Sequence, residues 1–239
     1  MQLDKPSEAY SQGKDEKVCG DCPLKSKSSG GNGACYVVTI HGPDGVARGI
    51  QNGGKASIVI DVGDGRYTAL SHLNSKAANR KTGDVCQTWI LPNSKAYPLK
   101  TTQIPDKIDK VVRFGAWGDP AFTDIKVTRR LARAAKGFLG YTHQWRKRKN
   151  LAPFCMASID PEMARRHGVS VADLKTQAHD RGYRTFRVMA EGDLPMADEV
   201  MCPNVTHGIQ CEDCMLCAGA TRQAKNICIP GHGTGKGAL

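Results

Sequence analysis

The chain contains no run approaching the roughly 18 consecutive apolar residues that a membrane-spanning helix requires. Its first residues, Met1–Pro6, include Asp4 and Lys5 and lack the apolar core of a signal peptide. We therefore expect no membrane partner and no secretion. Ten cysteines without a secretory signal predict a cytoplasmic location, where cysteines serve metals or catalysis more often than disulfides.

Two common catalytic signatures are also missing. No G-x-S-x-G sequence is present, so the usual nucleophile turn of a serine hydrolase is not predicted. The glycine-rich stretch 231–237 is similar to a phosphate-binding loop but lacks its spacing. Hydrolysis by an activated serine and phosphate-loop chemistry are therefore disfavoured.

Length and charge give broader limits. At 239 residues the chain suits one domain with an appended module, or two small domains. The net charge of +11 favours an anionic partner, with nucleic acid first. The basic residues are spread along the chain, however, and such a distribution also fits an ordinary solvated surface. The charge alone leaves both interpretations open.

The cysteines are concentrated near the carboxyl terminus. Cys211, Cys214 and Cys217 have C-x2-C-x2-C spacing, so that one tight loop can direct three thiolates at one point. Iron–sulfur clusters are commonly held in this way, with a more distant fourth cysteine. We predict Cys202 as that ligand and Cys228 as its substitute. Zinc bound by four thiolates is the alternative, and a disulfide knot is disfavoured because cysteines at this spacing bridge poorly to one another.

A second metal candidate lies near the amino terminus. Cys19, Cys22 and Cys35 form a C-x2-C-P-x11-C-Y element. Three thiolates suffice for a cluster with one open iron or for a catalytic zinc. Cys86, Cys155 or a histidine would instead complete a closed structural site. The sequence leaves these alternatives open, including one metal shared by both cysteine groups.

Short apolar runs alternate with helical segments, most regularly after residue 110. Strands are expected at 36–40, 57–62, 110–116, 138–143, 154–159 and 184–189, and helices at 68–73, 128–135 and 171–179, the last capped by Ser170. This alternation predicts an α/β fold with a parallel sheet, organised as an open or partial (β/α) barrel over residues 36–200. Residues 1–35 and 201–239 are predicted to form cysteine-rich metal-binding elements outside that core. Cys86 and Trp89 are expected to serve packing.

Polar residues follow four of the expected strands, where α/β folds bind their ligands. These candidates are Gly118, Asp119, His143, Ser158, Asp160 and Glu191. We predict catalytic roles for Asp119, His143 and Asp160. Cofactor binding is predicted for Gly118, Asp119, Ser158 and Glu191. Most of these residue types are also ordinary turn formers after any strand, so a structural role for each is equally open.

The order of these features resembles the radical S-adenosylmethionine enzymes, with a three-cysteine element, half a barrel and a later cysteine-rich module. Gly118-Asp119-Pro120 is similar in place and type to the family's Gly-Gly-Glu-Pro motif, which binds the cofactor amine. Met156–Asp160 resembles a later strand-end motif. The resemblance implies a [4Fe–4S] cluster that binds and reductively cleaves S-adenosylmethionine, with a second cluster in the C-terminal module. The family's C-x3-C-x2-C spacing is replaced here by C-x2-C-x12-C.

A closer resemblance is to an uncharacterised phage and mobile-element family called gene product eighty-eight. The matching motifs are Cys22-Pro23 with Cys35-Tyr36, Arg113 to Asp119, and Cys202-Pro203 with Cys211, Cys214, Cys217 and His232-Gly233. They extend over most of the chain. The resemblance implies a phage or plasmid origin and carries no established activity.

A metal-stapled nucleic-acid-binding protein is the competing hypothesis. The basic run 146–149 follows Trp145, and Arg129, Arg130 and Arg133 fall on one expected helix. Basic groups neutralise phosphates, and a neighbouring aromatic ring can stack on a base. An exposed basic loop without a ligand explains the same run. Oligomeric state is not indicated by the sequence.

Overall fold

Nine strands form one open, mostly parallel sheet in the order β1-β2-β3-β4-β5-β6-β7-β9-β8. A computed structural model describes residues 5–35, 37, 42–53, 58–72, 85–92 and 101–231. The strands are β1 (Ile58–Gly63), β2 (Arg66–His72), β3 (Val85–Pro92), β4 (Ile108–Trp117), β5 (Ala135–Thr142), β6 (Met156–Ile159), β7 (Thr185–Met189), β8 (Glu199–Met201) and β9 (Asn226–Pro230). The expected α/β fold is confirmed.

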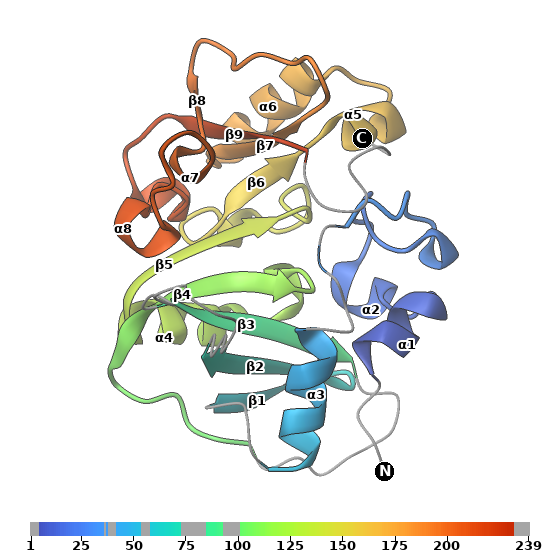
Figure 1. The fold of residues 1–239 in the computed structure, drawn as a ribbon, viewed down its shortest axis with the longest axis vertical. Coiled ribbons are helices and arrows are strands. Elements are labelled where there is room, and N and C mark those ends of the chain that lie inside the picture. Colours follow the sequence, from blue (N-terminus) through green and yellow to red (C-terminus); the bar gives the residue numbers. More distant parts are fainter. Residues whose placement is uncertain are drawn as a thin grey trace.

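The sheet divides into an antiparallel edge and a parallel majority. β1, β2 and β3 pair antiparallel. From β3 onward every neighbouring pair is parallel. The carboxyl ends of β4, β5 and β6 therefore lie along the same edge of the sheet, on the right in Figure 1.

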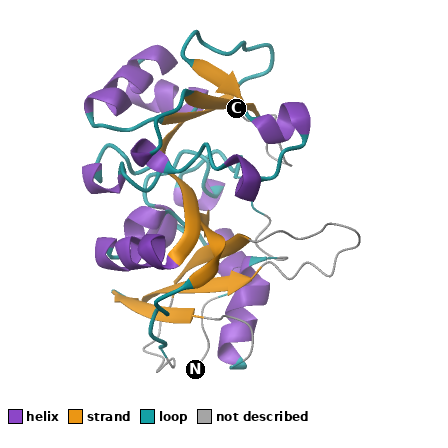
Figure 2. Cartoon of the chain, turned by 90° about the vertical axis from the view of Figure 1, so that its left-hand side faces the viewer, coloured by secondary structure: helices purple, strands orange, loops and turns teal. Residues whose placement is uncertain are grey.

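Helices cover both faces of the sheet (Figures 1 and 2). They are α1 (Pro6–Ser11), α2 (Glu16–Cys19), α3 (Pro43–Gln51), α4 (Ile125–Ala134), α5 (Pro161–His167), α6 (Val171–Asp180), α7 (Pro203–His207) and α8 (Cys211–Cys214). Leu131 of α4 packs in one core cluster with Val112 of β4. On the opposite face, Val46 of α3 packs in another cluster with Ala69 and Trp89. These apolar layers position the strand ends.

The later elements follow the sequence pattern closely. Ser170 caps α6 through a reciprocal capping box with Asp173, as expected from the serine before the helical pattern. Asp160 caps α5, where its side chain accepts a hydrogen bond from the Met163 backbone N–H and Pro161 takes the first helical position. Helix α5 was not expected from the sequence.

The earlier elements differ from expectation in several places, since helix α3 and strand β3 were not expected from the sequence. The helix expected at 68–73 is wrong, because Thr68 lies within β2. Asp64-Gly65 forms the turn of the β1–β2 hairpin, with positive φ at both residues, and this dipeptide favours hairpins. Partner strands on both sides then satisfy the backbone of β2. The strand expected at 36–40 lies outside the described residues apart from Val37.

The C-terminal part is joined to the sheet more closely than expected. β9 lies between β7 and β8, so residues after 201 contribute a strand to the core. The expected boundary at 200/201 falls inside β8. Arg187 of β7 forms a buried two-pronged ion pair with Glu199 of β8, with Nε–Oε1 and Nη2–Oε2 distances of 3.0 and 2.7 Å. This pair ties the last strands together across β9.

No helix among the described residues is long and apolar enough to cross a membrane. The described cysteines are all free thiols. Cys86 and Cys155 are buried in the core cluster that contains Leu131, and Trp89 is buried with its indole N–H donating to Ser71 Oγ at 2.6 Å. The expected packing roles of Cys86 and Trp89 are confirmed.

Arg187→Ala is expected to destabilise the fold by about 3–5 kcal/mol, because it removes the guanidinium that pairs with both oxygens of the buried Glu199 and leaves the more distant Lys175, at 3.9 Å, as its cation. Urea unfolding of the variant would measure the loss. Arg129→Ala, which removes an exposed arginine from α4, is the matched control and should change stability by less than about 0.5 kcal/mol. Equal stability of the two variants would contradict the assigned role of the ion pair.

Candidate functional site

The N-terminal three-cysteine element lies against the carboxyl ends of β4 and β5. The Asp119 N–H, just after β4, donates to the Val18 carbonyl at 2.7 Å. The Gln144 amide, just after β5, donates to the Cys19 carbonyl at 3.0 Å. Gly20 has φ +60°, and a Cβ there would lie 2.8 Å from the Phe122 ring, so only glycine fits. The sequence signal and the strand-end residues thus meet at one place.

A third contact fixes this segment from the side of α5. The Arg166 guanidinium donates to the Pro23 carbonyl at 3.2 Å and is itself held by Glu162 at 2.8 Å. Hydrogen bonds from Arg165, and then from Arg166, lower the pKa of Glu162 to about 2. Helix α5 therefore braces the cysteine segment with an arginine that stays paired at neutral pH.

Asp119 is buried and connects the two strand ends. One oxygen accepts from the Ala121 N–H at 2.9 Å and the Thr142 hydroxyl at 2.7 Å. The other oxygen accepts from the His143 N–H at 2.7 Å. Burial raises the pKa of Asp119, and these donors work against that shift. Because both oxygens are engaged within the chain, Asp119 acts here as a positioning residue.

His143 lies between the amino-terminal thiols and Asp160. Its Nε2 is 3.6 Å from Asp160 Oδ2, and both atoms are buried without a hydrogen-bond partner among the described residues. Burial alone would lower the pKa of His143, but the neighbouring Cys22 and Asp160 raise it well above its ordinary value. Of the strand-end candidates, His143 and Asp160 are the two with uncommitted polar atoms facing each other.

Cys19, Cys22 and Cys35 are electrostatic neighbours. Burial raises the pKa of Cys19 strongly, and Cys22 and Cys35 raise it further. Burial and then Cys22 raise the pKa of Cys35 to about 11, while His143 opposes this shift. The Cys35 N–H donates to the Leu24 carbonyl at 2.8 Å, which returns the chain to the first two cysteines. Cys22 is therefore an electrostatic neighbour of Cys19, Cys35 and His143.

The four later cysteines line a different pocket. Its walls are formed by Cys202, Cys211, Cys214 and Cys217 together with Leu139, Tyr141, Pro203, Asn204, Ile209, Met215, Leu216 and Ile227. Burial raises the pKa of Cys217 to about 12, and a hydrogen bond from Tyr141 acts in the opposite direction. Several apolar side chains thus surround the predicted four-thiol set.

Arg184 holds this cysteine-rich loop in place by donating to three backbone carbonyls. Its partners are Leu216 at 2.8 Å, Gly219 at 3.2 Å and Lys225. Gly219 has φ +65°, and a Cβ there would lie 2.7 Å from the Pro153 carbonyl oxygen. The close approach of the loop to the segment before β6 therefore requires glycine.

The two cysteine groups lie at separate places. Tyr141 reaches Cys217, whereas the adjacent Thr142 and His143 reach Asp119 at the strand end. Figure 1 accordingly shows α8 at the left of the sheet and α2 at its right, where the arrows of β4 and β5 end. One metal shared by both groups does not fit this separation. Cys228 does not line the four-cysteine pocket, and besides burial its strongest electrostatic neighbours are Glu199 and Arg187.

The arrangement of the two cysteine groups can be compared with what a metal ion or an iron–sulfur cluster requires. Within the described residues, no three His, Cys, Asp or Glu side chains are arranged to hold a single metal ion. The later pocket offers four cysteines, which is the number of thiolates that an iron–sulfur cluster or a structural zinc ion takes.

The remaining candidates are distributed as follows. Gly118 has φ +75°, and a Cβ there would lie 2.7 Å from the Ile90 Cβ, so its role is close packing. Ser158 is buried, and its carbonyl accepts from the Trp145 indole N–H at 3.1 Å. Glu191 is exposed in the turn after β7 and is not part of the network around Asp119. Trp145 is fully buried, so its ring offers no exposed face for stacking on a base in this structure.

Sequence reasoning missed Tyr141 and did not predict the contact that Gln144 makes. Tyr141 contacts Cys217, but its place in an apolar strand gave no signal that separates it from a core tyrosine. Gln144 binds the Cys19 carbonyl from a separation of 125 residues, which only the fold can create. Comparisons with known proteins add no further guide, since no family model, no curated protein and no solved structure matches the chain.

In reduced, metal-free protein at pH 8, iodoacetamide is expected to modify Cys202 and Cys214 at least about tenfold faster than Cys86 and Cys155. The first two are partly exposed, whereas burial raises the pKa of the other two and disfavours the reactive thiolate. Peptide mass spectrometry over time would measure each rate. In denatured protein all ten cysteines should react alike. Equal rates in the folded chain would contradict the assigned burial.

Proposed function

We propose that the chain is an iron–sulfur protein of the phage or plasmid type suggested by its motifs. Cys19, Cys22 and Cys35 would hold one [4Fe–4S] cluster at the strand ends. Cys202, Cys211, Cys214 and Cys217 would hold a second cluster in their own pocket. The observation that carries the proposal is the position of Cys19 and Cys22 against β4 and β5, beside His143.

Enzymatic chemistry of the radical S-adenosylmethionine type is our leading proposal for the first cluster. The strands β3 to β7 follow one another across the sheet, which suits the partial-barrel order of those enzymes. Gly118 and Asp119 stand at the end of β4, where that family places its amine-binding motif. When bound, a reduced cluster of this kind supplies the electron that cleaves the cofactor.

The chain's own residues would provide positioning and exclusion of water. Asp119 fixes the backbone at His143, and Gln144 fixes it at Cys19. Their joint effect is to hold the imidazole beside Cys22 in a buried setting. His143 and Asp160 would then bind or orient a polar group of the substrate or cofactor at the edge of the sheet. Charges in a site of low polarity act more strongly than in water, which favours such orientation.

Zinc-stapled nucleic-acid binding is the second candidate. The observation that favours it is the exposure of Arg129, Arg130 and Arg133 on one helix, α4. Arg130 is partly neutralised by Asp106 at 2.5 Å. This candidate requires that DNA or RNA affinity falls as salt rises. For each phosphate neutralised, the logarithm of the binding constant should fall by about 0.9 for every tenfold increase in salt concentration. Affinity independent of salt would exclude it.

Anaerobically purified protein is expected to contain iron and sulfide in equal amounts and to absorb broadly in the visible range. Cys19→Ala should remove only the amino-terminal share of the iron, and Cys214→Ala only the C-terminal share. Cys86→Ala, a change at a packing cysteine, is the control and should retain both. Metal analysis and absorbance measure these outcomes. Stoichiometric zinc without colour would contradict the proposal and favour the second candidate.

Reduced, cluster-loaded protein is expected to convert S-adenosylmethionine to 5′-deoxyadenosine, detected by chromatography. Cys19→Ala should abolish the product, because it removes a ligand of the amino-terminal cluster, while the C-terminal absorbance persists. Cys86→Ala again serves as the control. If fully loaded wild-type protein forms no product, radical chemistry is excluded and the iron–sulfur assignment stands alone.

A further inference from the structure

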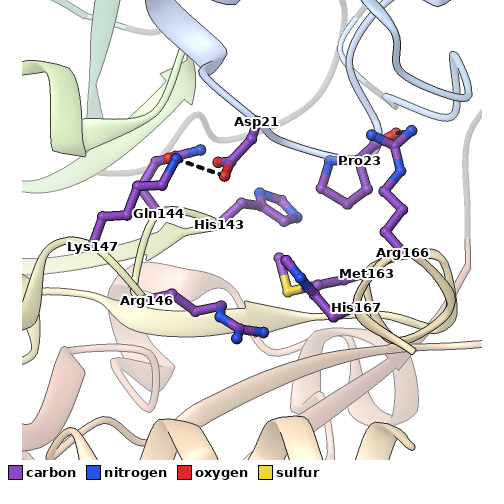
Figure 3. A pocket seen from close by; sticks show the side chains of 9 residues that line it. All are labelled: Asp21, Pro23, His143, Gln144, Arg146, Lys147, Met163, Arg166 and His167. Atoms are coloured by element: carbon purple, nitrogen blue, oxygen red, sulfur yellow. Dashed lines mark hydrogen bonds and ion pairs between the residues drawn. The ribbon is translucent and has the colours of Figure 1, made fainter. Parts of the chain in front are cut away.

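A small recess opens beside the amino-terminal thiols, between the three-cysteine segment and α5 (Figure 3). It is lined by Asp21, Pro23, His143, Gln144, Arg146, Lys147, Met163, Arg166 and His167. The recess is small, with a cavity volume of about 20 Å³, and it is open to solvent. We call it the cationic recess, because its lining contains three permanently positive side chains and one acidic residue, Asp21.

The three cations, Arg146, Lys147 and Arg166, differ in whether an acidic side chain already pairs with them. Lys147 pairs with Asp21 at 2.8 Å, and Arg166 is held by Glu162 at 2.8 Å. The Arg146 guanidinium lies over the Trp145 ring, with Cζ 5.8 Å from the ring centre, and its buried Nη1 has no hydrogen-bond partner among the described residues. A buried donor without an acceptor costs free energy, and a bound acceptor would recover it.

The surrounding field is positive as well. Burial lowers the pKa of His167, and the nearby Arg146, Arg166 and Lys147 lower it further, against Asp21. Burial is the largest cause of this shift in the pKa of His167, and the three neighbouring cations add to it. The same potential favours an incoming anion.

The arrangement of the guanidinium N–H groups indicates which anions the recess can bind. A guanidinium such as that of Arg146 presents planar, paired N–H groups that suit phosphate and carboxylate oxygens. A terminal phosphate carries up to two charges and three accepting oxygens, so it can engage Arg146 together with Lys147 or Arg166. The location at the carboxyl ends of β5 and β6 is also where open α/β sheets place their ligands.

We propose that the cationic recess binds the phosphate group of a small phosphomonoester, with Arg146 as its principal donor. Pro23 and Met163 line the recess and limit its width. A recess bounded in this way suits one terminal phosphate group better than a continuous nucleic-acid strand. The burial of Trp145 removes the neighbouring aromatic ring as a stacking platform for bases. His143 lines the recess and also neighbours Cys22, so an anchored ligand would lie beside the candidate catalytic groups.

The inference goes beyond the proposed iron–sulfur function, because the anion site consists only of side chains. Calorimetric titration of the full chain with inorganic phosphate, adenosine monophosphate and adenosine tests it. Both phosphate-bearing probes should bind, and adenosine should not. Arg146→Gln should weaken adenosine monophosphate binding about tenfold or more. Arg146→Lys keeps the positive charge but loses the planar pair of N–H groups, so its affinity for adenosine monophosphate should lie between those of wild type and Arg146→Gln.

Lys149→Gln is the matched control, since it removes one positive charge from an exposed position three residues away. Its affinities should stay within about twofold of wild type. Phosphate should also raise the thermal midpoint of wild type and Lys149→Gln, but not that of Arg146→Gln. This readout shows at the same time that the Arg146→Gln chain is folded.

Equal weakening in Arg146→Gln and Lys149→Gln would overturn the proposal, because it would reflect overall charge. Binding of a single-stranded oligonucleotide without binding of phosphate or adenosine monophosphate would overturn it in favour of a nucleic-acid contact. Repeating the titration with Cys19→Ala separates the two proposals. The variant should lose the amino-terminal iron and keep phosphate binding. In wild-type protein, phosphate binding without any iron would support the recess and contradict the clusters, and iron without phosphate binding would do the reverse.

Discussion

The carboxylate of Asp119 accepts three hydrogen bonds from groups that belong to two neighbouring strand ends. Its backbone N–H binds the amino-terminal segment at Val18. These contacts join the end of β4, the end of β5 and the turn that carries Cys19 and Cys22. A buried carboxylate is tolerated only when donors satisfy it, and here the satisfying donors are the groups whose positions define the site. The position of His143 follows from the same set of bonds.

The sheet keeps the two cysteine groups apart. Alternation along β5 directs Tyr141 toward the later cysteines and Thr142 toward Asp119. Because side chains on successive strand residues point to opposite faces, one strand serves two different sites. The proposed clusters would therefore have distinct surroundings, one at the strand ends beside polar groups and one among apolar side chains.

Positive charge is used in more than one way across the molecule. Arg184 donates hydrogen bonds to backbone carbonyls, and Arg187 donates to carboxylates, inside the fold. Arg166 braces the cysteine segment, whereas the buried Nη1 of Arg146 remains without an acceptor in the described structure. The net charge of +11 thus combines structural arginines with a smaller number that are placed to meet a ligand. Composition cannot separate these roles, because it does not report which donors are already engaged.

The sequence by itself determined the elements with strong local signals. Strands β4 to β7 and helices α4 and α6 were predictable from apolar alternation and from caps such as Ser170, and the cysteine spacing identified both candidate ligand groups. Missed features were the β2 strand, whose Asp64-Gly65 turn was overlooked, and the insertion of β9 between β7 and β8. Only the tertiary structure decided that Gln144 reaches Cys19, that His143 faces Asp160, and that Trp145 is buried. Those outcomes depend on contacts between distant segments, which local periodicity and spacing do not encode.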